Sequence, residues 1–181
     1  MTEQELEQIK HPIGSYKKPY VFTKEIIDQY ISVISELPEK LRKEIGHFTE
    51  EQLNTSYRPG GWTIRQVVHH FADSHINGFI RIKMVLTENI PTVKTYDEKL
   101  WAELIDSTKM SIEPSLQIIS GMHQRWAFLL ESLEEKDFKK TLFHPEYKRE
   151  IPIDEYTGLY AWHCEHHTAQ ILGLKKRMNW K

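Results

Sequence analysis

The fold of this chain is decided by residues 63–87, TIRQVVHHFADSHINGFIRIKMVLT. Thr63 and Gln66 fit a capping box, in which two side chains satisfy free backbone N–H groups at the start of a helix. The apolar residues that follow recur three and four positions apart, the period of a helix with one buried face: Val67, Val68, Phe71, Ala72, Ile76, Phe79, Ile80, Val85 and Leu86. We therefore expect a long amphipathic helix from about residue 64 to about residue 87.

Three other stretches repeat this period. One begins at Thr23 and contains Pro38, which should kink the helix or start a second segment, because proline interrupts a helix interior. Another follows Ser111, with Pro114 in its first turn, where proline is tolerated. The last begins near Ile153. Four amphipathic helices with polar joints predict an all-α four-helix bundle.

The connecting segments predict smaller features. Asp97 is expected to cap one of several short extra helices, and residues 142–151 to form a short hairpin or loop. Residues 1–22 contain Pro12, Gly14 and Pro19, which predict an irregular N-terminal arm. The connections after the second and third long helices exceed what an up-down bundle needs, so we expect one helix pair to run parallel. Length alone predicts a single domain over residues 1–181.

Composition limits the class of protein. The net charge is −2 and no basic run stands out, so a nucleic-acid partner is not expected. No apolar stretch approaches the ~20 residues of a membrane span, and the start MTEQELEQIK lacks the apolar run of a signal peptide. Cys164 is the one cysteine, which excludes an internal disulfide and fits a reducing compartment. We therefore expect a cytoplasmic protein without a membrane partner.

The histidines are unevenly distributed along the chain. There are 10, and six of them fall in residues 69–75 and 163–167. A neutral imidazole is the commonest protein ligand for a metal ion. The clustering therefore suggests a metal site between two helices.

Spacing places some of these histidines on common faces. A helix turns by about 100° per residue, so His163 and His167 lie about 40° apart on one face and can hold one ion. His166 is a weaker alternative on the other side of His163. Two histidines at this spacing are more often surface or capping residues, so the pair alone is weak support for a metal.

The helix over residues 64–87 adds a second set of candidates. His69 and His70 lie among apolar residues, where a histidine is either a neutral core imidazole or a ligand that faces the bundle interior. Asp73 is a candidate to orient a ligand histidine or to accept a hydrogen bond from bound water, and equally an exposed aspartate. His75 lies about 140° from His70 around the helix and is not expected to share the ion. His123 is a candidate to line the same cavity.

Four segments resemble a known family. Residues 61–74, GWTIRQVVHHFADS, are similar to the first motif of the DinB superfamily, and residues 160–167, YAWHCEHH, to its second. Residues 11–17, HPIGSYK, and 96–99, YDEK, are similar to the YfiT-like branch of that superfamily. Members of this branch are described as metal-dependent hydrolases and as bacillithiol S-transferases.

The resemblance implies a four-helix bundle that holds one divalent metal ion per chain. Its ligands would be His70, His163 and His167, with His70 preferred to His69 because it directly precedes Phe71-Ala72-Asp73. Zn²⁺ is the expected ion and Ni²⁺ the alternative. The resemblance also implies a homodimer. Two departures, Cys164-Glu165 and Gln170, remove no ligand but alter the surroundings of the site.

Three hypotheses for the function follow. Three neutral imidazoles leave an open coordination position, which is typical of catalytic zinc. The first hypothesis is a hydrolase that activates water against a small-molecule substrate, with Asp73, His69 and His166 as weak candidates for the catalytic acid or base. The second is an S-transferase that joins a low-molecular-weight thiol such as bacillithiol to an electrophile. The third is a non-enzymatic metal-binding interaction module.

Overall fold

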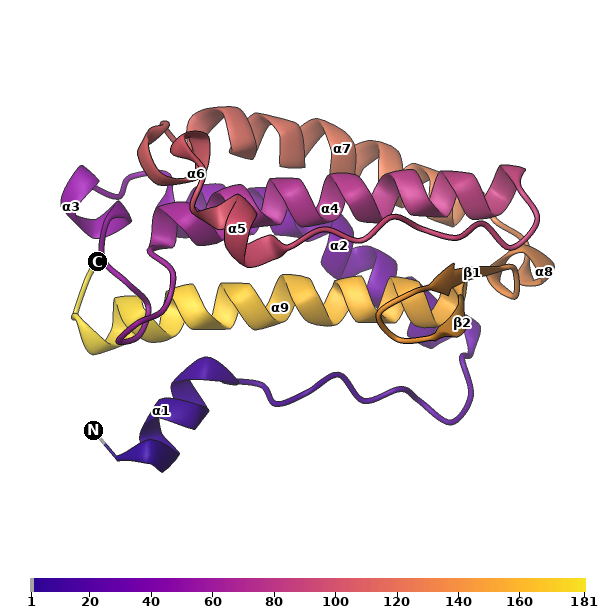
Figure 1. Cartoon of the computed structure of the whole chain (residues 1–181), viewed down its shortest axis with the longest axis horizontal. Helices are drawn as coiled ribbons and strands as arrows, with labels where there is room; N and C mark the ends of the chain where they lie inside the picture. The colour runs from indigo at the N-terminus through magenta and orange to yellow at the C-terminus, as the bar shows by residue number, and fades with distance from the viewer. Residues whose placement is uncertain (1) are drawn as a thin grey trace.

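Four long helices form the body of the computed structural model, which describes residues 2–181 (Figure 1). They are α2 (Lys24–Ile45), α4 (Ile64–Thr87), α7 (Glu113–Glu131) and α9 (Ile153–Arg177). The expected all-α four-helix bundle is therefore confirmed, with short helices and a small hairpin added to it. Within residues 2–181, none of the helices is both long enough and apolar enough to cross a membrane.

The bundle contains parallel neighbours, as the long connections predicted. Helices α2 and α4 each pack against both α7 and α9. Along α4 and α7, His69 meets Ser115 and Phe79 meets Trp126, so these two helices run in the same direction. The ribbon shows that α2 and α9 also run in one direction, opposite to α4 and α7 (Figure 1). Two parallel pairs therefore exist where one was expected.

Short elements occupy the connections. Helix α3 (Glu50–Leu53) lies between α2 and α4, α5 (Glu98–Ala102) and α6 (Ile105–Lys109) lie between α4 and α7, and α8 (Glu135–Phe138) follows α7. Asp97 caps α5 by accepting hydrogen bonds from the backbone, as expected. Strands β1 (Thr141–His144) and β2 (Arg149–Pro152) pair antiparallel, so the segment predicted as a hairpin or a loop is a hairpin.

The prediction of an irregular arm over residues 1–22 is wrong for its first part. Helix α1 (Glu3–Lys10) forms there and is started by a capping box between Thr2 and Glu5. Residues 11–22 contain no helix or strand and run along the outside of α9 (Figure 1). The indole N–H of Trp162 donates to the carbonyl of Gly14 and attaches this arm to α9.

Pro38 lies inside one continuous helix and does not start a second segment. It is buried in α2, which runs from Lys24 to Ile45. Proline has no N–H, so the carbonyl of Ile34, four residues earlier, loses its usual helical donor. The Nδ1–H of His123 on α7 replaces that donor. The helix tolerates Pro38 because a neighbouring helix satisfies the carbonyl that it leaves free.

Helix α4 is the most enclosed of the four. It packs against α7, α9, α5 and α6, which cover it on several sides. Gly78 allows the closest approach to α9, because a Cβ atom there would lie 2.4 Å from the ring of Tyr160. The hydroxyl of Tyr160 then donates to the carbonyl of Ser74, at 3.0 Å. This contact fixes the register between α4 and α9, on which the site depends.

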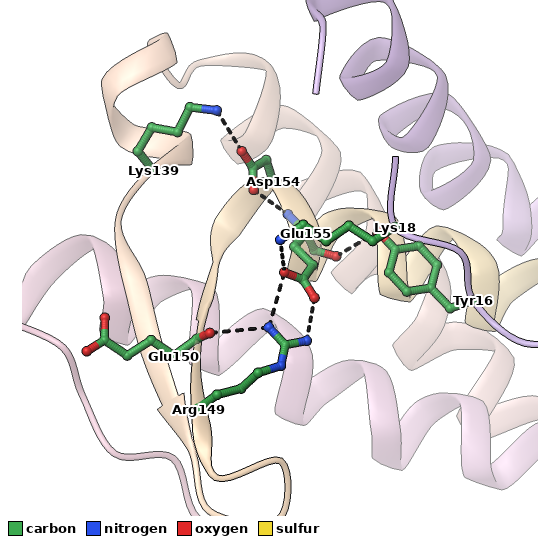
Figure 2. A network of polar contacts seen from close by, with 7 residues as sticks. All are labelled: Tyr16, Lys18, Lys139, Arg149, Glu150, Asp154 and Glu155. Atoms are coloured by element: carbon green, nitrogen blue, oxygen red, sulfur yellow. Dashed lines mark hydrogen bonds and ion pairs between the residues drawn. The ribbon is translucent and has the colours of Figure 1, made fainter. Parts of the chain in front are cut away.

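The first turn of α9 carries two buried carboxylates, shown in Figure 2. Glu155 accepts hydrogen bonds from Lys18 of the N-terminal arm and from Arg149 of β2. Asp154 accepts from Lys139, which follows α8, at 2.8 Å. These ion pairs attach the arm and the hairpin segment to the start of α9.

Candidate metal centre

The structure brings together the three histidines that were expected to bind metal. His70 on α4 meets His163 and His167 on α9, and one ring nitrogen from each lies within 4.8 Å of the other two. The Nε2 atoms of His70 and His163 are 3.1 Å apart. His163 and His167 share a face of α9 because they are four residues apart, and the antiparallel packing of α4 and α9 places His70 opposite them.

All three imidazoles are neutral at pH 7. Burial, with a smaller contribution from the nearby His166, lowers the pKa of His70 to about 4. Burial also lowers the pKa of His163 and of His167 well below the usual range, and the neighbouring histidines add to this. A neutral imidazole has one N–H and one nitrogen with a free lone pair. Each ring can therefore give one lone pair to a cation.

A chain of hydrogen bonds determines which nitrogen of His163 has the free lone pair. Its Nδ1 lies 2.9 Å from Nε2 of His75, whose Nδ1 lies 2.8 Å from Nε2 of His123. Nδ1 of His123 contacts the carbonyl of Ile34, which can only accept, so His123 must donate there. With each ring neutral, His123 then accepts from His75, and His75 accepts from His163. The lone pair of His163 is thereby on Nε2, which faces His70.

A separate set of hydrogen bonds determines which nitrogen of His167 has the free lone pair. The side-chain amide of Gln170 must direct its NH₂ group to the carbonyl of Lys10, which accepts at 2.8 Å. Its Oε1 therefore lies at Nδ1 of His167, 2.8 Å away, and Nδ1 must carry the proton. The lone pair of His167 is on Nε2. The last residue of α1 thus helps to orient a histidine of the cluster.

These residues fit a divalent metal ion. Zn–N bonds of about 2.0–2.1 Å in tetrahedral geometry put ligand nitrogens roughly 3.3 Å apart. The 3.1 Å between His70 and His163 is close to this value. Two bare lone pairs repel each other at such a distance, so a proton or a cation must lie between them. A metal-binding histidine usually donates the N–H of its other ring nitrogen to a fixed acceptor. His163 and His167 both do so through Nδ1.

The three candidates for the catalytic acid or base lie elsewhere. Nδ1 of His69 is 2.7 Å from the hydroxyl of Ser115, so this ring links α4 to the start of α7. His166 stacks on Trp162, on the side of α9 that faces the N-terminal arm. Asp73 is half-buried, and its pKa is raised to about 6 by burial and by Asp106. None of the three is among the residues that line the cavity at the cluster.

That cavity has a volume of about 340 Å³ and extends along α4 and α9. The three clustered histidines line one part of it, and Arg81, Tyr156 and Tyr160 line another. Sequence reasoning missed Arg81 and the two tyrosines. The spacing of Arg81 was a usable signal: it is 11 residues from His70, just over three whole helical turns, and so lies on the same face of α4.

Residues 34–171 match the family model described as the DinB superfamily. The chain belongs to the DinB superfamily. Similar curated proteins of that family cover nearly the whole chain. One from Geobacillus thermodenitrificans, named "Putative metal-dependent hydrolase", is 45% identical over 175 residues, which are 97% of this chain and 98% of that protein. One from Bacillus cereus with the same name is 49% identical over 177 residues, 97% of this chain and 100% of that protein.

A solved structure is also similar. It is described as "YfiT from Bacillus subtilis is a probable metal-dependent hydrolase with an unusual four-helix bundle topology". The TM-score is 0.93 at 45% sequence identity, covering 96% of this chain and 99% of that one. The resemblance to the YfiT-like branch is therefore confirmed. That description and this chain share a four-helix bundle.

Proposed function

We propose that this protein is a metal-dependent hydrolase that holds one divalent ion per chain with His70, His163 and His167. The observation that carries the proposal is the convergence of these three ring nitrogens beside a cavity. The names of the curated relatives support the same class of enzyme.

The side chains prepare the site for a cation. Three neutral imidazoles contribute no charge, so the ion keeps its full charge of +2, and with three protein ligands at least one coordination position stays open. When bound, the ion supplies Lewis acidity toward a substrate carbonyl and toward the proton of water. His70 and His167 are buried, so little of either ring is exposed to solvent. We propose Zn²⁺ as the ion, with Ni²⁺ as the alternative, because imidazole suits both.

The test is cleavage of a panel of small esters by the Zn²⁺-loaded protein without any thiol. We expect cleavage that is lost after chelation and in His163→Ala. The matched control is His47→Ala, which removes an exposed histidine outside the cavity and should leave the rate unchanged. Equal rates in His163→Ala and the unmodified chain would refute the proposal.

A second candidate is a metal-dependent S-transferase that joins a small thiol to an electrophile. It is favoured by the position of Asp73, His69 and His166 outside the cavity lining, because a thiolate needs little help from a base. The assay uses bacillithiol and an electrophilic test compound. Adduct formation that depends on thiol, without ester cleavage, would replace the hydrolase by this function. Inactivity in both assays with metal retained would favour a binding module.

We also propose that the protein is a cytoplasmic homodimer. The buried, unpaired Cys164 supports a reducing compartment. Sedimentation of the protein at micromolar concentration tests the dimer, and a single species with the mass of one chain would contradict it.

A further inference from the structure

Two buried arginines of α4 differ in their partners. Arg65 is 2% exposed and forms an ion pair with Glu50. Arg81 is 8% exposed, and within residues 2–181 its hydrogen bonds go only to neutral acceptors. These are the hydroxyl of Tyr156, at 3.1 Å, and the backbone carbonyl of Lys94. Charges buried in proteins are normally paired, because removing a charge from water is costly.

Arg81 also lines the cavity that contains the histidine cluster. A guanidinium has five N–H donors in a rigid plane, and the two hydrogen bonds described above use only two of them. The remaining donors suit an oxyanion, which a guanidinium can bind through two parallel hydrogen bonds. His144 of β1 lines the same cavity, is 6% exposed, and its Nδ1 has no partner within residues 2–181.

We infer that the group missing from Arg81 is a carboxylate of the substrate. The inference rests on the proposed function in one respect, namely that the reacting group lies at the histidine cluster. The substrate is then a small molecule with an anionic end at Arg81 and a reactive end at His70, His163 and His167. The Cα atoms of His70 and Arg81 are about 16 Å apart along α4, so the anionic end and the reactive end are separate groups of the molecule.

The charged side chains around the cavity favour a ligand with a single negative charge. Among the described residues that line the cavity, Arg81 is the one arginine or lysine. The same lining includes two exposed carboxylates, Glu98 and Glu146. One buried cation balances one carboxylate, whereas these acids disfavour a second negative charge on the ligand. A phosphate dianion therefore fits less well than a monocarboxylate.

The test is an NMR titration of the metal-free protein with butyrate, followed at the Nε–H signal of Arg81. Metal-free protein is used because carboxylates also bind open metal sites. We expect saturable binding of butyrate and binding at least 10-fold weaker for butyramide, its neutral isostere, and for inorganic phosphate. Arg81→Gln should weaken butyrate binding at least 10-fold, because a hydrogen bond to a charged group contributes about 1.5–3 kcal/mol. The control Arg125→Gln removes an exposed arginine of α7 and should have no effect.

Several outcomes would overturn the inference. These are equal binding of butyrate and butyramide, unchanged butyrate binding in Arg81→Gln, or tighter binding of phosphate. The comparison of butyrate with butyramide uses the unmodified chain, so the test survives if Arg81→Gln fails to fold. Butyrate selectivity without any ester cleavage would keep this inference and reject the hydrolase. Ester cleavage without butyrate selectivity would do the reverse.

Discussion

Helix α9 holds two polar regions that are stabilised in different ways. In its first turn, Asp154 and Glu155 are buried carboxylates paired with basic side chains that reach in from the surface. Two to three turns later, His163 and His167 are neutral, and within residues 2–181 they hydrogen-bond only to other neutral groups. The first region attaches peripheral segments to the bundle. The second fixes two lone pairs toward one point, which is a preparation for a cation and contributes little as an attachment.

The largest expected effect is on metal binding and comes from the second region. His163→Ala removes one of the three proposed ligands and should weaken Zn²⁺ binding by more than about 100-fold, because loss of an outer partner alone costs about 10–100-fold. Elemental analysis after dialysis, together with competition against a chelator, measures this. Glu155→Gln is the control from the first region and should retain one ion per chain.

Outer partners of the ligands should have the next largest effect. His75→Phe removes the acceptor that holds the Nδ1 proton of His163, so Zn²⁺ affinity should fall about 10–100-fold. His123→Phe should act through the same chain, and the double variant should be no worse than His75→Phe alone. Chelator competition measures all three. Additive losses would show that the two rings act independently.

Gln170→Leu tests the corresponding support of His167. It removes the acceptor for Nδ1 of His167 and should also lower Zn²⁺ affinity about 10–100-fold. Because it uses a different set of hydrogen bonds, its effect should add to that of His75→Phe. Full affinity in Gln170→Leu would mean that packing alone orients His167.

The first region should affect stability and leave metal affinity unchanged. Glu155→Gln should lower the free energy of unfolding by about 1–3 kcal/mol, since it weakens charged hydrogen bonds to Lys18 and Arg149. Urea unfolding of the metal-free protein measures the difference. Lys24→Gln, which removes an exposed pair with Asp28, is the control and should cost under about 1 kcal/mol.

The same carboxylate should give the smallest effect, a dependence of stability on pH. Burial would raise the pKa of Glu155, but hydrogen bonds and attraction from Arg149 and Lys18 outweigh this and lower it. A lowered folded-state pKa stabilises the protein above the unfolded value of about 4.3, and this stabilisation is lost as pH falls through the folded-state pKa. The stability difference between the unmodified chain and Glu155→Gln should therefore shrink below about pH 4.3.

Much of the fold and part of the site could be predicted from the sequence. The long helices follow from apolar periodicity and capping residues, and the histidine spacing fixed which residues could share a face. The roles of His75 and His123 could not be predicted, because they depend on how α7 is aligned with α4. The lack of a carboxylate partner for Arg81 could not be predicted either. It becomes evident only from the positions of the surrounding side chains in the folded structure. Helix α1 was missed because the prolines and glycine that follow it dominated the prediction for residues 1–22.

Replacing Pro38 could raise the stability of the protein and at the same time lower its affinity for metal. Replacing a proline within a helix by alanine is an ordinary step in engineering for heat resistance, since proline costs about 3 kcal/mol there. In this protein, Pro38→Ala would supply an N–H that competes with His123 for the carbonyl of Ile34. A variant selected for its melting temperature would then be expected to bind a metal ion less tightly, although none of the proposed ligands had been altered.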